Sequence, residues 1–359
     1  MQHPKKLKIA VYAISKNEAS FVQRFYDSCK GADLILLADT GSTDSTVQHA
    51  RELGMCVYNI SIVPWRFDRA RDAALALLPP DIDVCISLDL DEVLEPGWRE
   101  IIESVWQADT TRLRYVYDWG QDLRFMYDKI HARVGYTWHH PCHEYPRPDS
   151  RIQEKFAETP RLLVRHLPDN TKSRGQYLDL LHLATVEDPN CSRNAFYYAR
   201  ELSFNGNWAL AAEKFQQYLA MPQATWLHER CYAMRLLGRC FESQPQPDNN
   251  TALKWYMLAT IEAPGTREPW YDLAMFCHRT AQWTLCYHAA LQALSITGKE
   301  LVYTCDPAAW GSAPADLASI AAWQLGLPDV AIEYAKMAAA IDPTNDRIRQ
   351  NLEFMLEVN

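Results

Sequence analysis

The sequence predicts an α/β domain with a Rossmann-like sheet, followed by an all-α domain of helical repeats. First, 359 residues are more than one hydrophobic core usually supports, so two or more domains are expected. Second, strand-like and helix-like segments alternate through the first half, which is typical of βαβ units. Third, strand-like segments vanish from about Asn194 onward, and a helical pattern repeats instead. We therefore expect one domain over residues 1–190 and another over residues 191–359.

The first elements are strands rich in Ile, Val and Leu, with helices between them. The predicted strands are residues 7–14, 34–38, 55–60 and 84–88, and the predicted helices are residues 19–29, 46–53 and 69–78. Right-handed crossovers between parallel strands bring the carboxyl ends of all the strands to the same edge of a sheet. Ligands of open α/β sheets bind at that edge.

The elements that follow are less regular. We expect a helix over residues 98–106, antiparallel strands over 113–119 and 123–127, a strand over 161–165 and a helix over 172–186. Residues 136–148 are dense in His, Pro and Trp and show no period, which predicts a loop. Long loops in compact domains are often functional.

Small residues at helical spacing mark the repeats of the second half. They recur together with Leu and aromatic residues at Ala211 and Phe215, Leu237 and Gly238, Ala252, Tyr256 and Ala259, Trp270 and Ala274, and Ala331, Ala335 and Ala338. Such residues let paired helices approach closely, and the period predicts a tetratricopeptide-like solenoid rather than a generic bundle. Uneven spacing indicates insertions at residues 244–250 and 297–314.

Composition and charge argue against several classes of protein, namely nucleic-acid-binding, secreted and membrane-spanning proteins. A formal net charge of −9 provides no basic field for a polyanion, so nucleic acid is not an expected partner. The ten cysteines include no C-x-x-C pair, which favours reduced thiols and a cytoplasmic location. The apolar stretch near the start is too short for a signal peptide, and no apolar run is long enough to span a membrane.

Two acidic clusters follow predicted strands. Asp39 follows the second strand, and Asp89 and Asp91 follow the fourth. Carboxylates that meet at one sheet edge are hard oxygen ligands, which suit Mg²⁺ or Mn²⁺ carrying a diphosphate. The structural alternatives are a capped helix after Asp39 and a turn ending the strand before Asp89.

Three segments taken together resemble family 2 glycosyltransferases: residues 14–18 (ISKNE), 38–46 (ADTGSTDST) and 87–92 (SLDLDE). Residues 65–72 (WRFDRARD) are similar to that family's aromatic-then-Ala-Arg-Asn segment, with Asp72 in place of the usual Asn. The resemblance covers roughly the first half of the chain. It implies a GT-A fold and inverting transfer of a sugar from a nucleoside-diphosphate-sugar donor, a UDP-sugar in the first instance. It also implies a Mn²⁺ or Mg²⁺ cofactor and an acceptor hydroxyl or thiol.

The resemblance also implies roles for single residues. Asp39 would contact the base, Arg71 the base or diphosphate, and Asp89 the metal and ribose. Asp91 would be a metal ligand. Residues 136–144 (YTWHHPCHE) look like the family's aromatic-then-His-Glu segment, which faces the acceptor. Inverting transfer needs a carboxylate that takes the acceptor's proton, and Glu144 is the candidate for this catalytic base.

Histidines and basic residues complete the expected site. His143 would bind the metal or orient the diphosphate. His166 resembles the late His of metal-dependent relatives and would complete the metal shell, while Lys172 or Arg174 offsets phosphate charge. The alternatives are that Arg71 is a solvated helix charge, that the loop histidines hydrogen-bond to the backbone, and that His166 belongs to a capped turn.

The leading functional prediction is therefore a metal-dependent glycosyltransferase. A second prediction, of another class, is a repeat scaffold whose first domain binds nucleotide without turnover. A nucleotidyltransferase is disfavoured, because residues 15–18 offer no Gly-rich loop to hold a triphosphate. The repeats would recognise the acceptor, whether glycan, protein or small molecule, or build a homodimer.

Overall fold

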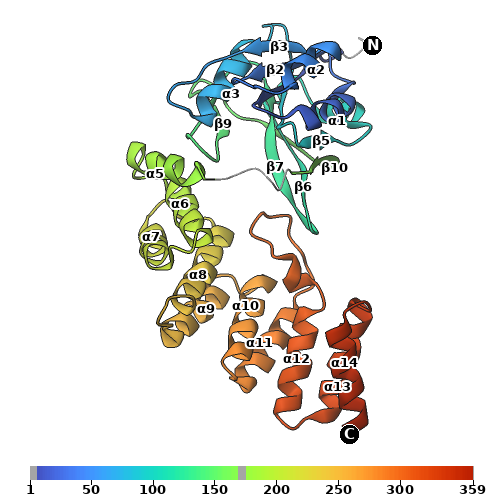
Figure 1. Ribbon diagram of the computed structural model, residues 1–359, viewed down its shortest axis with the longest axis vertical. Helices are drawn as coiled ribbons and strands as arrows, with labels where there is room; N and C mark the ends of the chain where they lie inside the picture. Colours follow the sequence, from blue (N-terminus) through green and yellow to red (C-terminus); the bar gives the residue numbers. More distant parts are fainter. Residues whose placement is uncertain (1–5, 169–174, 359) are drawn as a thin grey trace. The chain divides into compact units, whose positions relative to one another are not determined.

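The computed structural model describes residues 6–168 and 175–358. The chain divides into two compact units, Met1–Glu187 (unit 1) and Asp188–Asn359 (unit 2) (Figure 1). Unit 1 is a mixed α/β domain, and unit 2 is an all-α, tetratricopeptide-like repeat domain. Among the described residues, no helix combines the length and apolar character needed to cross a bilayer.

Unit 1 is built on an eight-stranded mixed sheet in the order β3-β2-β1-β4-β7-β6-β10-β5. Its strands are β1 (Ile9–Ser15), β2 (Leu34–Asp39), β3 (Cys56–Asn59), β4 (Val84–Ser87), β5 (Glu92–Leu94), β6 (Arg112–Gly120), β7 (Leu123–Ala132) and β10 (Phe156–His166). The first four strands along the chain are parallel to one another. Strand β7 runs antiparallel between β4 and β6, as the sequence predicts for the later strands.

Helices cover both faces of this sheet. They are α1 (Ala19–Cys29), α2 (Thr46–Glu52), α3 (Phe67–Ala76) and α4 (Trp98–Val105), and α5 (Tyr177–Glu187) ends unit 1. Side chains alternate between the two faces of β1. Val11 packs in one apolar cluster with residues of α1, α2 and α4, whereas Tyr12 packs in a second cluster with residues of α3. Strand β1 is therefore buried on both faces, which explains its uninterrupted apolar sequence.

The sheet register aligns the predicted acidic clusters. Ser15 at the end of β1 pairs with Asp39 at the end of β2, and Ser87 at the end of β4 pairs with Tyr12 of β1. These parallel strands therefore reach the same edge of the sheet. Because Ile86 of β4 pairs with Ile130 of the antiparallel strand β7, β7 also passes this edge.

The segment expected to be a loop, residues 136–148, is largely a hairpin, so that prediction is wrong. Strands β8 (Tyr136–His139) and β9 (Tyr145–Pro148) form a separate two-stranded sheet. Tyr136 and Trp138 are buried while Thr137 between them is exposed, an alternation too short to recognise beside several prolines. Prolines are tolerated here because both members of a two-stranded sheet are edge strands.

Unit 2 is an array of antiparallel helix pairs. Its helices are α6 (Ser192–Phe204), α7 (Trp208–Ala220), α8 (Leu227–Glu242), α9 (Asn249–Glu262), α10 (Arg267–Arg279), α11 (Trp283–Ser295), α12 (Ala313–Gln324), α13 (Pro328–Ile341) and α14 (Asp346–Val358). Each even-numbered helix from α6 to α12 packs against the helix that follows it. The pairs α6/α7 and α8/α9 also pack against each other through α7 and α8, which continues the array. This packing is the tetratricopeptide-like architecture that the period predicts.

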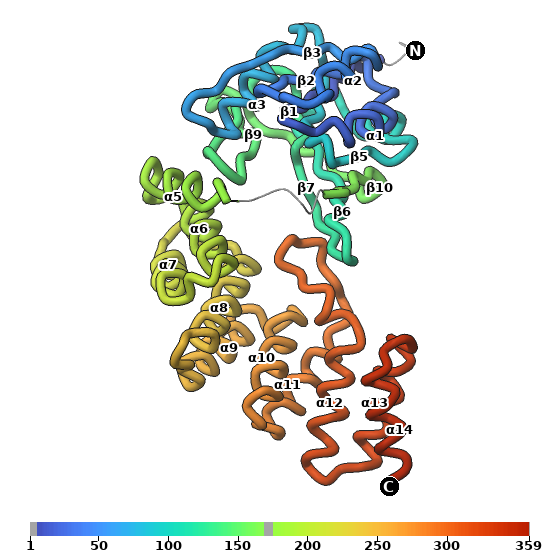
Figure 2. The backbone as a smooth tube through the Cα atoms, viewed as in Figure 1, coloured from blue at the N-terminus to red at the C-terminus, as the bar shows by residue number. Residues whose placement is uncertain are grey.

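The long connection between α11 and α12 matches the insertion predicted at residues 297–314. It contains the short 3-10 helix η1 (Pro307–Trp310). Figure 2 shows the backbone leaving α11 and turning back before it enters α12. The other connections between helix pairs are much shorter, as in most helical repeats.

Candidate functional site

Arg71 joins the predicted site residues in unit 1. It lies on α3 with only 2% of its surface exposed. Its guanidinium donates hydrogen bonds to a carboxylate oxygen of Asp89 at 2.7 Å, to the hydroxyl of Ser87 at 3.1 Å and to Oε1 of Glu144. It also lies 5.0 Å from the ring centroid of Trp138. The structure therefore brings Arg71, Asp89 and Glu144 together around one buried cation.

Lys129 is a second buried cation at this site, and sequence reasoning missed it. Its ammonium lies 3.5 Å from Oδ2 of Asp89 and 3.8 Å from Oε1 of Glu92. Burial disfavours the charge on Lys129, but the two carboxylates outweigh this and hold its pKa well above the ordinary value. Lys129 stands in a strand that also carries Arg124, Asp128 and His131, so the local sequence contains no signal that singles it out.

Glu92 holds the turn that presents the Asp-x-Asp pair. Its carboxylate is buried and accepts hydrogen bonds from the hydroxyl of Tyr117 at 2.6 Å and from the backbone N–H of Asp89 at 2.9 Å. Burial raises the pKa of Glu92. For Asp89, burial acts in the same direction, but Arg71 and Lys129 outweigh it and hold the pKa of that carboxyl well below its usual range.

Asp91 and His166 form a separate pair beside this cluster. Oδ2 of Asp91 lies 3.4 Å from Nε2 of His166. The backbone N–H of Leu167 donates to the carbonyl of Asp91 at 2.8 Å, which fixes the end of β10 against the turn. The other ring nitrogen of His166, Nδ1, is buried and has no hydrogen-bond partner within residues 6–168 and 175–358.

A hollow of about 260 Å³ opens next to His166. It is lined by Asp118, Gly120, Gln121, Asp122, Arg124, Arg165, His166 and Leu167. The ring of Trp119 lies 4.3 Å from that of His166, centroid to centroid, and 43% of the Trp119 surface is exposed. The Asp91–His166 pair is therefore close to a space that could admit part of a ligand.

The donor set at Asp91 and His166 fits a divalent cation only in company with a ligand. In the described part of the chain, no group of three or more His, Cys, Asp or Glu side chains is arranged to hold a metal by itself. Mg²⁺ is commonly bound through one or two carboxylates, with substrate phosphates and waters completing its shell. Asp91 suits that mode, whereas the imidazole of His166 suits Mn²⁺ better than Mg²⁺. Asp89 instead lies against two cationic side chains.

Asp39 already has several hydrogen bonds within its own loop. It is 3% exposed and accepts from the backbone N–H groups of Gly41 at 3.0 Å and Ser42 at 2.9 Å. The hydroxyls of Ser15 and Ser42 also donate to its Oδ1. Gly41 adopts a φ of 106°, which glycine permits most readily, so this turn is built around the Asp39 carboxylate.

The remaining predicted residues lie as follows. His143 precedes Glu144 in the turn between β8 and β9, and its ring centroid is 6.3 Å from that of Tyr177. Lys172 and Arg174 fall outside the described residues. Asp72 accepts a hydrogen bond from the backbone N–H of Trp138 at 2.7 Å, so it anchors β8 to α3. An Asn side chain could accept the same hydrogen bond, so this contact does not explain the acid at a position where the resembled family has Asn.

Comparisons with known proteins add little to this geometry. No protein-family model matches the chain, and no curated protein does either. Among solved structures, YrrB, described as a TPR protein with an unusual peptide-binding site, is 12% identical over 50% of this chain and 82% of its own, with a TM-score of 0.40. MamA from Desulfovibrio magneticus is 14% identical over 48% of this chain and 87% of its own, with a TM-score of 0.38. A TPR protein from Thermus thermophilus is 15% identical over 51% of this chain and 91% of its own, with a TM-score of 0.35.

Proposed function

We propose that unit 1 is a metal-dependent glycosyltransferase of the GT-A type, similar to family 2 enzymes. The observation that carries the proposal is Arg71, a buried cation that ties the end of β4 to the Glu144 turn through Asp89 and Glu144. A buried salt bridge alone adds little to stability, because desolvation offsets the attraction. An ion-pair cluster at the ligand-binding edge of an α/β sheet is better explained by function.

The proposed reaction is inverting sugar transfer from a nucleoside diphosphate. The acceptor oxygen attacks the anomeric carbon, and a new carbon–oxygen bond forms as the bond to the diphosphate oxygen breaks. The acceptor's proton passes to Glu144, whose Oε1 is held by Arg71, so we assign the accepting role to Oε2. The nucleoside diphosphate leaves with the electron pair of the broken bond.

Other residues of the cluster bind and orient in this proposal. Arg71 and Lys129 are fixed positive charges near the place where the diphosphate would lie, and such preorganised charges stabilise developing negative charge. Asp91 and His166 would hold Mg²⁺ or Mn²⁺, which would supply charge neutralisation at the departing diphosphate. The exposed ring of Trp119, which lies against His166, would flank the metal and its ligand.

The first test is donor binding followed by turnover. A thermal-shift panel of UDP-, GDP- and dTDP-sugars with Mn²⁺ should reveal the donor, because a bound ligand stabilises the folded state.

We expect Glu144→Gln to keep donor binding and to lose about a hundredfold or more in turnover. We expect Asp91→Asn to lose metal-dependent binding, and Glu100→Gln, an exposed acid on α4, to serve as the matched control. An Asp91→Asn protein with full turnover and unchanged metal dependence would overturn the proposal.

The competing candidate is a scaffold in which unit 1 binds nucleotide without turnover. The helical repeats of unit 2 favour it, because such arrays offer extended concave surfaces that bind partners. In this case unit 2 would bind a partner peptide and unit 1 would act as a sensor. Calorimetry that finds nucleotide binding, together with no donor hydrolysis or transfer to any acceptor class, would favour the scaffold.

A further inference from the structure

The connection between α11 and α12 packs against the first helices of the preceding pairs. Residues 296–306, here called the insert, contact α6, α8 and α10 or the residues just before them. These helices are the first members of the pairs α6/α7, α8/α9 and α10/α11. The faces of α6, α8 and α10 that the insert contacts, carrying Tyr197, Glu229, Arg235 and Glu268, are here called the inner groove.

Tyr303 is the aromatic anchor of the insert. Its hydroxyl donates a hydrogen bond of 2.6 Å to Oε2 of Glu229, a residue of α8 that is 7% exposed. Its ring stacks on that of Tyr197 from α6, with centroids 6.2 Å apart and an interplanar angle of 22°. Trp226 lies on another side, with centroids 5.4 Å apart. A phenol bound both by ring stacking and by a buried carboxylate is a specific contact.

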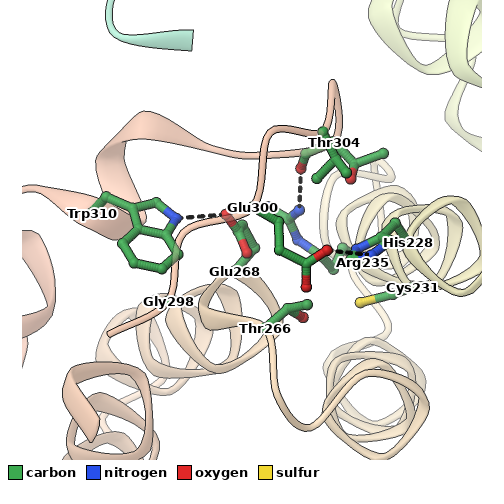
Figure 3. A pocket seen from close by; sticks show the side chains of 10 residues that line it. His228, Cys231, Arg235, Thr266, Glu268, Gly298, Glu300, Thr304 and Trp310 are labelled. Atoms are coloured by element: carbon green, nitrogen blue, oxygen red, sulfur yellow. Dashed lines mark hydrogen bonds and ion pairs between the residues drawn. The ribbon is translucent and has the colours of Figure 1, made fainter. Parts of the chain in front are cut away.

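Arg235 and Glu268 bind the backbone and the acidic end of the insert. Arg235, which is 4% exposed, donates to the carbonyl of Thr304 at 3.2 Å and lies 3.7 Å from a carboxylate oxygen of Asp306. Glu268 accepts from the backbone N–H of Asp306 at 3.4 Å and from the indole N–H of Trp310, just beyond the insert, at 2.7 Å (Figure 3). His228 pairs with Glu300 at 3.2 Å. Polar contacts to backbone and side chains, rather than apolar packing, thus hold much of the insert.

The chain on the two sides of the insert is held together. The guanidinium of Arg267 donates to the carbonyl of Ile296, the first residue of the insert, at 3.0 Å and to that of Ala309, three residues beyond its last residue, at 3.4 Å. Compact loops with adjacent ends are frequently functional. The space left between the insert and the helices is about 20 Å³, room for about one water. The insert therefore nearly fills the part of the groove that it covers.

We propose that the inner groove is a peptide-binding site and that the insert occupies it as an intramolecular ligand. The peptide class it takes is a chain that turns at a tyrosine and carries an acidic residue three positions later, as Tyr303 and Asp306 do, with the turn closed by the backbone N–H of Cys305 donating to the carbonyl of Val302 at 3.1 Å. Glu229 accepts a hydrogen bond from the phenol hydroxyl. Arg235 donates to the backbone carbonyl of the residue after the tyrosine and forms an ion pair with the carboxylate. Because a tethered ligand has an effective concentration of about millimolar, the groove is closed to weakly binding partners. This inference is independent of catalysis in unit 1.

The test removes the insert and supplies it as a separate peptide. Residues 298–306 of the full chain are replaced by a short Gly-Ser linker, since the chain on the two sides of the insert is held together, and helicity and melting temperature check the fold. A fluorescent peptide of residues 298–308 is then titrated into the shortened and the intact chains. We expect micromolar binding to the shortened chain and binding about a thousandfold weaker to the intact chain, which is the ratio of a millimolar effective concentration to a micromolar dissociation constant. A Tyr303→Phe peptide should bind about tenfold more weakly, because a hydrogen bond to a buried carboxylate is lost.

Two outcomes would overturn the proposal: a folded, shortened chain that does not bind the peptide, or equal binding to both chains. Should the shortened chain fail to fold, Tyr303→Ala in the full chain replaces it. This substitution removes one anchor and leaves the linker and the helices in place. We then expect faster thermolysin cleavage within residues 296–306 together with new peptide binding. Unchanged cleavage and no binding would count against the insert as a displaceable ligand.

Discussion

At the scale of single residues, Arg71 determines how the candidate site is held together. It is shared between Asp89 and Glu144, which come from different parts of the chain. Removing one member of a buried ion pair is costly because the partner stays behind, buried and uncompensated. We expect Arg71→Met to lower the free energy of unfolding by about 3–5 kcal/mol, measured by urea denaturation. Arg69→Met, at an exposed position on the same helix, should change it by less than about 0.5 kcal/mol.

The carboxyl group of Asp89 should make the free energy of unfolding depend on pH in the acidic range. Its folded-state pKa lies below the ordinary value because Arg71 and Lys129 outweigh burial. The stabilisation is therefore fully present above the unfolded pKa of about 3.9 and is lost as the pH falls through that value towards the folded pKa. We expect Asp89→Asn to destabilise the protein at pH 7 and the difference from wild type to shrink by pH 3. A difference that stays constant with pH would contradict this.

The sequence could identify some site residues and not others, for a physical reason. Arg71, Asp89, Glu144 and His166 stand in recognisable motifs, and three of them share a cluster of ion pairs. Lys129 belongs to no recognisable sequence motif. It reaches the site only because β7 pairs antiparallel with β4. Glu92 and Tyr117 likewise meet only through the sheet order. Such partners depend on long-range pairing, which local patterns do not contain.

At the scale of elements, the sequence predicts helix and strand boundaries correctly where local residue patterns determine them. The predictions fail where contacts with residues distant in the sequence determine the element. The helix predicted over residues 19–29 is α1 without change, since its apolar period is strong. Strand β10 is much longer than the predicted residues 161–165, because pairing with β6 extends it across a register shift. The sequence does not predict the hairpin of β8 and β9, because contacts with distant residues stabilise it. Trp138 of β8 donates its backbone N–H to Asp72 of α3 and packs in the same apolar cluster as residues of β1 and α3.

Close helix packing in unit 2 rests on small residues, and Gly238 is the sharpest case. A Cβ added at Gly238 of α8 would lie 3.0 Å from ring atoms of Tyr256 on α9. Alanine normally favours a helix over glycine by about 0.5–1 kcal/mol, but overpacking costs about 1–3 kcal/mol. We therefore expect Gly238→Ala to lower the free energy of unfolding, measured by thermal or urea denaturation. Gly265→Ala, where a Cβ meets open space, should be neutral or stabilising; equal effects at both sites would refute the packing argument.

At the scale of the whole molecule, the two units have their own cores. The clusters around Val11 and Tyr12 lie within unit 1, and those around Phe276, Ala331, Met234 and Ile348 lie within unit 2. The division between Glu187 and Asp188 falls near the predicted boundary at residues 190 and 191, where strand patterns give way to helical repeats. Domain organisation is thus visible in sequence because the hydrophobic period itself changes there.

We expect residues 188–359 to fold without unit 1. Each helix pair buries its apolar face against a neighbouring pair, and stability in such arrays comes from repeats and their nearest neighbours. The separate fragment should therefore show a helical circular dichroism spectrum and a cooperative thermal transition. Within it, Tyr303→Ala should lower the melting temperature, because the buried carboxylate of Glu229 then loses one of the two hydrogen bonds that it accepts from tyrosine hydroxyls. A fragment that lacks helicity, or that melts without a transition, would show that the repeats depend on residues 1–187.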